Sequence, residues 1–402
     1  PPFGTPWGGK DAAEGVENAV NEEYKKGVDG RWGAGLPGSG DMQMLFLQSA
    51  IDKMDENVGR AAIIENGSPL FNGGTSSGES QIRRWMLEND MVEAIIGLPV
   101  DLFYNTGIAT YIWVLSKNKR SERKGKIQLI DASSFCHRLR KALGDKRNEI
   151  SPKDRSEITK LYADFVENQF SKIYKNEDFI YREYVVMQPL QRSYTITKDR
   201  ITTMLSKGTL SSLYDEAKVI ELESSEELTG KELKKLEAYQ DNKSIYDDII
   251  KELYSSESEK VYYSPEEFMP VLIKILSAVT TDKKLIDKIA EGLSIMDKNA
   301  VIQRDKKGNI IYDKDTKDIE IVRYEESIED YMEREVLPYV PDAVAFFEEN
   351  LDSKKPVIKT GAEIPFTRNF YKYQKQTPSE ELRVKFTKLE MVMSELIAEL
   401  FS

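Results

Sequence analysis

The strongest constraint on the fold is an alternation of apolar and amphipathic segments between residues 41 and 131. The segments GRAAIIEN, VEAIIGLP, ATYIWVLSKN and KIQLIDAS are short and rich in β-branched or aromatic residues, which predicts buried strands. DMQMLFLQSAIDKM, with Asp41 as a candidate N-cap, and ESQIRRWMLEND have the spacing of helices. Helices that alternate with buried strands indicate a parallel α/β sheet. No helix separates the last two strands, so we expect them to form a hairpin at the sheet edge.

The rest of the chain divides into regions of different character. The first forty residues are rich in Gly, Pro and charge, and predict a long exposed loop with a short helix near Val16–Tyr24. From about Ser134 the pattern becomes mostly helical, and Lys307–Asn309 is a turn signal inside a small hairpin. We therefore expect an α/β domain over residues 1–135, a helical extension over residues 136–200, and a mainly helical C-terminal region over residues 201–402.

Composition excludes several classes of protein. Hydrophobic residues make up 40% and charged residues 31% of the 402 residues, which is typical of a soluble globular protein of two or three domains. No apolar run approaches the roughly 18 residues that a membrane span needs. The single cysteine, Cys136, cannot form an internal disulfide, which fits the reducing cytoplasm. We expect neither a catalytic pair of Cys136 with His137 nor a metal site at Asp313, Asp315 and Asp318.

The charge is spread unevenly along the chain. Residues 1–200 carry 28 basic and 28 acidic side chains, so the whole net charge of −12 lies in residues 201–402. Residues 117–160 carry 14 Lys or Arg against 6 Asp or Glu. This stretch is able to meet phosphates, and an ordinary solvated helix face explains it equally well.

The C-terminal segment TPSEELRVKFTKLEMVMSELIAELF predicts a helix with Thr377 as its N-cap. Its apolar residues follow a spacing of 4, 3, 4, 3, 4, which is the seam of a coiled coil: Leu382, Phe386, Leu389, Met393, Leu396 and Leu400. Such a seam needs a partner helix, which lies either in this chain or in another subunit.

The chain opens with PPFGTPW. By itself, a Pro-Pro-aromatic start is more typical of a disordered tail than of a site. Here a Gly-rich loop, a helix and a buried strand follow it, and ligands of such sheets bind outside the carboxyl ends of the strands.

PPFGTPW resembles the end of the Asn-Pro-Pro-Phe motif of methyltransferases that act on the amine of adenine. The segments that follow resemble the modification subunit of type I restriction–modification systems, well over residues 1–135 and more loosely over the last 45. They are DMQMLFLQSAIDKM, GRAAIIENGSPLFNGG, IRRWMLENDMVEAIIGLPVDLFYNTGIATYIWVLSKNK and EIPFTRNFYKY. The resemblance implies the C-terminal half of a Rossmann-like methyltransferase sheet, followed by a mainly helical C-terminal region.

The resemblance also implies roles for the first residues. In the family, an Asn side chain and the next Pro carbonyl accept hydrogen bonds from the adenine amine. Carried over, Pro1 and Pro2 hold the turn, and Phe3 stacks on an adenine that has left the duplex. The Asn and the segment that binds S-adenosylmethionine would precede this chain. We therefore expect negligible affinity for S-adenosylmethionine and no methyl transfer by these residues alone.

Two further loops are candidates for the site. Gly4 and Trp7 continue the first loop, and Gly73 and Gly74 allow a mobile flap after a strand, although a plain surface connection explains them equally well. Phe103 lines the base pocket or packs the end of the sheet; the sequence leaves both open.

The family resemblance implies the partners DNA, a specificity subunit docked on the C-terminal helix, a second copy and a restriction subunit. The alternative function is a scaffold without chemistry that binds partner helices and DNA. A nucleotide hydrolase is a weaker reading, since no phosphate-binding loop is present.

Overall fold

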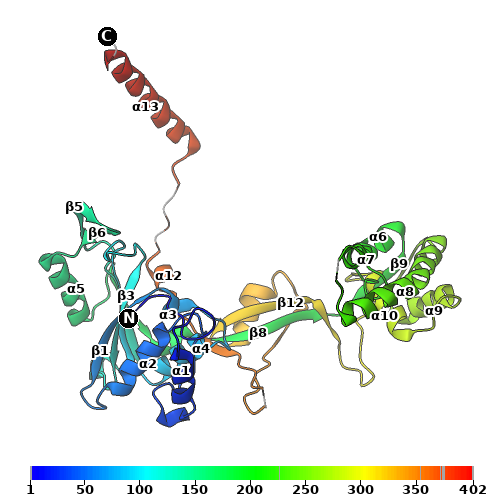
Figure 1. The fold of residues 1–402 in the computed structure, drawn as a ribbon, viewed down its shortest axis with the longest axis horizontal. Helices are drawn as coiled ribbons and strands as arrows, with labels where there is room; N and C mark the ends of the chain where they lie inside the picture. Colours follow the sequence, from blue (N-terminus) through cyan, green and yellow to red (C-terminus); the bar gives the residue numbers. More distant parts are fainter. Residues whose placement is uncertain (1, 226, 354, 372, 374–375, 401–402) are drawn as a thin grey trace. The chain divides into compact units, whose positions relative to one another are not determined.

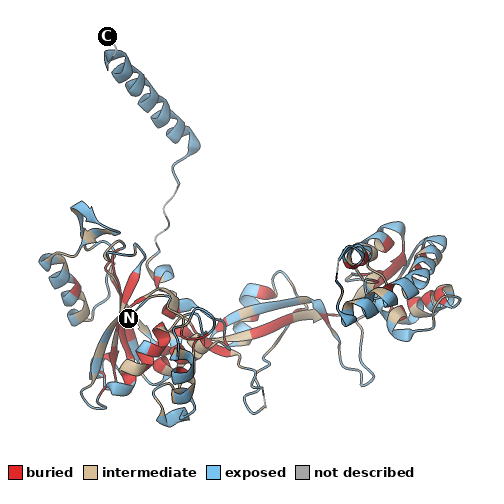
Figure 2. Cartoon of the chain, viewed as in Figure 1, coloured by how far each residue is buried: buried red, intermediate tan, exposed pale blue. Residues whose placement is uncertain are grey.

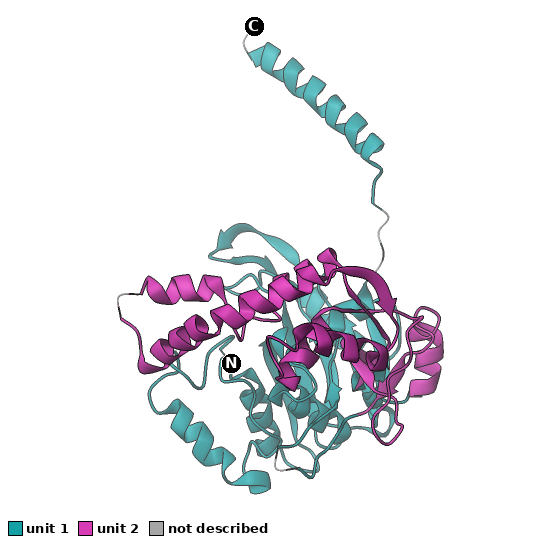
Figure 3. Cartoon of the chain, turned by 90° about the vertical axis from the view of Figure 1, so that its right-hand side faces the viewer, with its two compact units in different colours: residues 1–183, 321–326, 348–402 teal, residues 184–320, 327–347 magenta. Residues whose placement is uncertain are grey.

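The computed structural model describes every residue except 1, 226, 354, 372, 374–375 and 401–402. The chain divides into two compact units, coloured separately in Figure 3. Unit 1 is Pro1–Glu183, Ile321–Glu326 and Glu348–Ser402, and unit 2 is Tyr184–Glu320 and Ser327–Phe347.

The centre of unit 1 is a five-stranded sheet with the order β1-β3-β2-β4-β7 (Figure 1). Only β2 and β4 pair in parallel; the other neighbouring strands are antiparallel. The strands are β1 Arg60–Asn66, β2 Val92–Gly97, β3 Thr110–Ser116, β4 Lys126–Asp131 and β7 Ser171–Lys175.

The four predicted strands are present, but two expectations about their arrangement are wrong. β3 lies between β1 and β2 and runs against both, so the sheet is mixed. The last two predicted strands, β3 and β4, do not form an edge hairpin, because β2 lies between them. Since β1 and β2 both run antiparallel to β3, they point the same way and their carboxyl ends lie at one edge of the sheet.

Helices cover both faces of this sheet. Ile95 of β2 packs with Leu47 of α2 (Gln43–Lys53) and Ile82 of α4 (Gly78–Glu88). The next residue, Ile96, points to the opposite face and packs with Ile158 of α5 (Pro152–Asp164). Every residue of β2 is buried. Figure 2 shows red, buried segments in the sheet of unit 1.

Short elements and a C-terminal helix complete unit 1. The predicted helix near Val16–Tyr24 is α1, with these bounds. Arg83 of α4 is fully buried and donates to the carbonyls of Ala362, Pro69 and Asn72, which ties the C-terminal part of the chain to α4. The other elements are η1 Gly27–Asp29, α3 Ser68–Phe71, η2 Ser121–Arg123, β5 His137–Leu143, β6 Lys146–Glu149, η3 Asn176–Phe179, β14 Thr360–Ala362, α12 Phe366–Phe370 and α13 Ser379–Leu400.

Unit 2 combines helices with two small sheets. One sheet has the order β10-β9-β11. The other has the order β12-β8-β13, with β14 also paired to β8, and its strands β8 and β12 each include residues of unit 1. The predicted turn at Lys307–Asn309 lies in unit 2. It is closed by a hydrogen bond in which the Asp305 N–H donates to the Asn309 carbonyl at 2.8 Å. The elements are β8 Ile180–Pro189, β9 Arg192–Ile196, α6 Lys198–Ser206, α7 Glu216–Glu223, α8 Gly230–Ser255, β10 Ser258–Tyr262, α9 Pro265–Leu276, α10 Lys283–Gly292, β11 Ser294–Met296, β12 Tyr312–Arg323, α11 Ile328–Tyr331, the π-helical η4 Met332–Val336 and β13 Val344–Phe346.

The structure changes the predicted division of the chain. Residues 136–200 contain β5 to β9 as well as α5, so they are not a helical extension. Their strands carry many charged, partly exposed side chains, which hide the period of two. The boundary between the units falls between Glu183 and Tyr184, not at residue 135 or 200. Among the described residues, no helix combines the length and apolar character needed to cross a membrane.

Candidate functional site

The candidate site is formed by two aromatic rings at the carboxyl edge of the sheet. Phe3 belongs to the first loop of the chain, and Phe103 to the loop that joins β2 to β3. Their ring centroids lie 6.1 Å apart with an interplanar angle of 84°, an edge-to-face contact. Phe3 is half-buried rather than enclosed in a core. The first loop therefore presents an aromatic side chain beside the end of a strand.

The first loop is held by hydrogen bonds to the segment that opens α2. The Met42 N–H donates to the Thr5 carbonyl at 3.0 Å, and the N–H groups of Trp7 and Gly8 donate to the Ser39 carbonyl at 2.9 and 3.2 Å. Gly4 has φ = 61°, a conformation that favours glycine, and this turn precedes the fixed part. Phe3 is thus placed by backbone contacts.

The loop of Phe103 is also closed at its base. The Leu98 N–H donates to the Thr110 carbonyl at 2.8 Å, and the Asp101 N–H donates to the Gly107 carbonyl at 3.4 Å. Asp101 has φ = 59°, which is uncommon for a residue other than glycine. Tyr104, the next aromatic residue, is 59% exposed and does not pack the sheet end.

The other predicted site residues have different surroundings. Trp7 is buried with Val20 and Leu45, and its Nε1 donates to the Gly38 carbonyl at 3.1 Å. Gly73 lies against Ser77, the N-cap of α4, whereas Gly74 has open space around it. Pro2 is exposed, and Pro1 lies outside the described residues. Among the predicted site residues, Phe3 and Phe103 are therefore the two whose side chains contact each other.

Glu65 near the carboxyl end of β1 is a polar residue that the sequence pattern did not single out. Its side chain is fully buried, and neither carboxylate oxygen has a hydrogen-bond partner among the described residues. Burial raises the pKa of Glu65 to about 8, and the negative charge of Asp41 also raises it. The signal that could have found it is a carboxylate inside the apolar strand GRAAIIEN.

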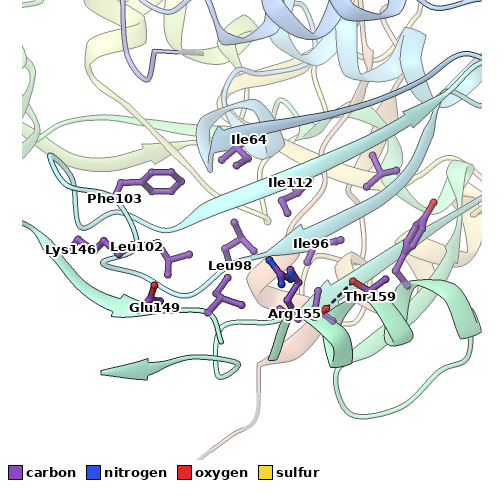
Figure 4. A pocket seen from close by; sticks show the side chains of 14 residues that line it. Ile64, Ile96, Leu98, Leu102, Phe103, Ile112, Lys146, Glu149, Arg155 and Thr159 are labelled. Carbon is purple, nitrogen blue, oxygen red and sulfur yellow. Dashed lines mark hydrogen bonds between the residues drawn. The ribbon is translucent and has the colours of Figure 1, made fainter. Parts of the chain in front are cut away.

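A cavity of about 530 Å³ opens beside Phe103, on the face of the sheet that carries α5 (Figure 4). Ile64, Ile96 and Ile112 form its apolar floor, and Figure 4 shows Phe103 and Lys146 at one end. Arg155 and Tyr162 of α5 supply polar groups. A cavity of this volume and lining is of the kind that holds a small organic group.

The glycine-rich segment Gly38–Gly40 does not fit a cradle for S-adenosylmethionine. It follows a loop and not a strand, and its polar groups are used inside the chain. The Gly38 N–H donates to Glu79 Oε1 at 2.7 Å, and its carbonyl accepts from Trp7.

The surroundings of Cys136 do not favour a nucleophilic thiol, and Asp313 and Asp315 are engaged by an arginine. Burial and the charge of Asp154 raise the pKa of the Cys136 thiol, which disfavours the nucleophilic thiolate. Asp313 and Asp315 both accept hydrogen bonds from Arg192. No cluster of His, Cys, Asp and Glu suited to a metal ion occurs within the described part of the chain.

The site therefore combines a mixed α/β sheet with an edge-to-face pair of aromatic rings at its carboxyl edge. Residues 1–199, just under half of the chain, match the family described as N-6 DNA Methylase. The chain is 31% identical over 180 residues to the type I restriction enzyme MjaVIII methylase subunit of Methanocaldococcus jannaschii. It is 34% identical over 117 residues to the HindI methylase subunit of Haemophilus influenzae. The predicted relationship to type I modification subunits is confirmed.

The chain matches only part of each relative. The aligned region covers 44% of this chain and 29% of the MjaVIII subunit, and 29% of this chain and 25% of the HindI subunit. Among solved structures, the type I methyltransferase subunit of Streptococcus thermophilus has 22% identity and a TM-score of 0.37, over 44% of this chain and 33% of that one. A type I modification subunit of Vibrio vulnificus has 18% identity and a TM-score of 0.32, over the same shares.

Proposed function

We propose that this chain is the base-holding part of a type I modification subunit that methylates the N6 amine of adenine in DNA. The observation that carries the proposal is the contact of Phe3 with Phe103 at the carboxyl edge of the sheet, within the N-6 DNA methylase segment. An adenine that leaves the duplex stacks on aromatic side chains in such pockets. The base would replace the edge contact of the two rings with contacts to their faces.

The chemistry requires a fixed amine. The lone pair of the adenine amine is delocalised into the ring, so the amine is a poor nucleophile and needs hydrogen bonds that orient it. Pro2 has a restricted φ and no N–H. It therefore adds no backbone donor that would compete with the adenine amine for a nearby carbonyl. Phe3 supplies the face on which the base rests.

The methyl donor in this proposal is S-adenosylmethionine. Since Gly38–Gly40 does not fit a cradle for it, we propose that the 402 residues alone bind S-adenosylmethionine weakly and do not transfer methyl groups. Calorimetric titration of the chain with S-adenosylmethionine tests this part, and micromolar binding would refute it.

The central test is methyl transfer by the chain assembled with the other parts of its system. We expect label from S-adenosylmethionine in DNA, recovered as N6-methyladenine after digestion. Phe3→Ala should lower the rate about fivefold or more, since base–aromatic stacking contributes about 1–3 kcal/mol. Phe46→Ala, which removes a partly exposed ring of α2, is the matched control. Equal rates for the two variants would contradict the role of Phe3.

The proposed partners follow the family. We propose DNA as substrate, a specificity subunit docked on α13, and a second copy and a restriction subunit in the full cytoplasmic complex. The described residues of α13 include none that is buried, which leaves its apolar seam available to another chain. The same seam favours the alternative, a non-catalytic scaffold; assembly without any methyl transfer by the complete complex would select that alternative.

A further inference from the structure

The hairpin of β5 and β6 is a basic, exposed ribbon that no part of the proposed chemistry uses. Residues 137–149 contain Arg138, Arg140, Lys141, Lys146 and Arg147 against Asp145 and Glu149. Within the part of the chain that the structure describes, the two strands pair with each other and with no third strand, and most of their residues are exposed (Figure 2). The whole chain has a net charge of −12, so this is a local reversal of sign.

The positive charges of the ribbon are not neutralised from within. Among the described residues, no carboxylate pairs with Arg138, Arg140, Lys141 or Arg147. Within the ribbon, His137 Nε2 lies 3.9 Å from Glu149 Oε2. Four exposed guanidinium and ammonium groups therefore keep their full capacity for an external anion.

The ribbon is fastened to the loop that carries Phe103. The N–H groups of Arg147 and Asn148 donate to the Asp101 carbonyl at 2.9 and 3.1 Å, and the Asp145 N–H donates to the Tyr104 carbonyl at 2.9 Å. Lys146 Nζ lies 5.4 Å from the centre of the Tyr104 ring. Figure 4 shows Phe103, Lys146 and Glu149 around the same end of the cavity.

We propose that the β5–β6 ribbon binds the phosphates of duplex DNA next to the base held by Phe3 and Phe103. This inference rests on the proposed function for the position of the base. A two-stranded ribbon fits the major groove, and unpaired Arg and Lys side chains release counterions from the phosphates they contact. In an acidic chain this ribbon supplies the local positive field that draws DNA to the site. Its bonds to Asp101 and Tyr104 couple the DNA backbone to the position of Phe103.

Salt dependence of DNA binding tests the ribbon. We would measure the anisotropy of a labelled duplex of about 30 base pairs with the full chain, from about 20 to 200 mM salt. The variant Arg138→Ala/Arg140→Ala/Lys141→Ala should bind more weakly. Its slope of log affinity against log salt should fall by about 0.9 for each phosphate that the variant no longer neutralises, hence by up to about 2.7.

The control variant Lys251→Ala/Lys274→Ala/Lys284→Ala makes the same charge change at exposed residues of unit 2. It should keep the wild-type slope, and thermal melts should show that both variants are folded. Equal slopes for the two variants, or no DNA binding by the wild type at the lowest salt, overturn the inference. This assay needs no methyl transfer, so it tests the ribbon independently of the proposed function. The proposed function would fail in a different way, if the complete complex bound DNA without methylating it.

Discussion

At the scale of single residues, Glu65 is the most unusual group of the site region. A buried carboxylate without a partner is unfavourable, because it loses its hydration and gains no compensating hydrogen bond. The nearby Gln43 accepts from the Asn66 N–H at 2.9 Å and donates to Asp41 Oδ2 at 2.6 Å, and so is already engaged. Glu65 therefore keeps its proton near neutral pH, in keeping with a pKa of about 8.

This protonation predicts a pH-dependent stability. Below pH 4.5 the Glu65 carboxyl is neutral in both states; between 4.5 and about 8 only the unfolded chain ionises. The free energy of unfolding should therefore fall with rising pH in this window, by at most about 1.4 kcal/mol per pH unit. Glu65→Gln should flatten the profile and be more stable than the wild type at pH 8, as measured by urea unfolding.

Glu232 provides the control for Glu65. Hydrogen bonds from the side chain and backbone of Thr229 lower the pKa of Glu232, so its contribution to stability is lost only as the pH falls below 4.5. Glu232→Gln should thus change the profile on the acid side alone. A Glu65→Gln profile parallel to that of the wild type between pH 5 and about 8 would contradict the neutral carboxyl.

At the scale of elements, the sequence predicted what is local and missed what depends on pairing. β1 to β4 were predictable because their buried segments are rich in β-branched residues. The position of β3 between β1 and β2 could not be predicted, since no local sequence pattern encodes which strands become neighbours. β5 was missed because HRLRKAL is charged along an exposed strand. Phe3 and Phe103 were named singly, but their contact depends on that topology.

The junction between the β5–β6 ribbon and the Phe103 loop depends on one glycine. Gly144 has φ = 64°, and a Cβ there would lie 2.5 Å from the Tyr104 carbonyl oxygen. Gly144→Ala should therefore lift the ribbon and break the bonds to Tyr104 and Asp101. We expect faster hydrogen exchange at the amides of Asp145, Arg147 and Asn148, with the core of the sheet unchanged.

Gly125→Ala separates backbone strain from the clash. Gly125 has a similar φ of 69°, but no heavy atom lies within 4 Å of the point that an alanine methyl group would occupy, so alanine there adds strain alone. Exchange of the ribbon amides should stay at the wild-type rate in this variant. Identical exchange in the Gly144 and Gly125 variants would show that the ribbon is not seated on Tyr104.

At the scale of the whole molecule, exposed apolar surface and negative charge are concentrated in particular parts of the chain. The sheet of unit 1 buries its apolar side chains, whereas α13 leaves its seam open: Phe386 is 65% and Leu389 is 67% exposed. Residues 201–402 carry the entire negative excess. An acidic region with an exposed heptad seam is better suited to bind a protein helix than a DNA backbone. The seam was predictable from spacing alone; its exposure was not.

The seam of α13 gives the last prediction. Leu389→Asp/Leu396→Asp should abolish assembly with the specificity subunit in a co-purification assay, because two charges in a heptad seam remain desolvated at the interface. The melting of the α/β domain should not change, since the described part of α13 buries no residue. Val384→Asp/Met391→Asp, on the opposite side of the helix by heptad position, should assemble normally. Loss of the melting transition in the seam variant would show instead that the seam packs within this chain, and equal assembly of both variants would remove α13 from the interface.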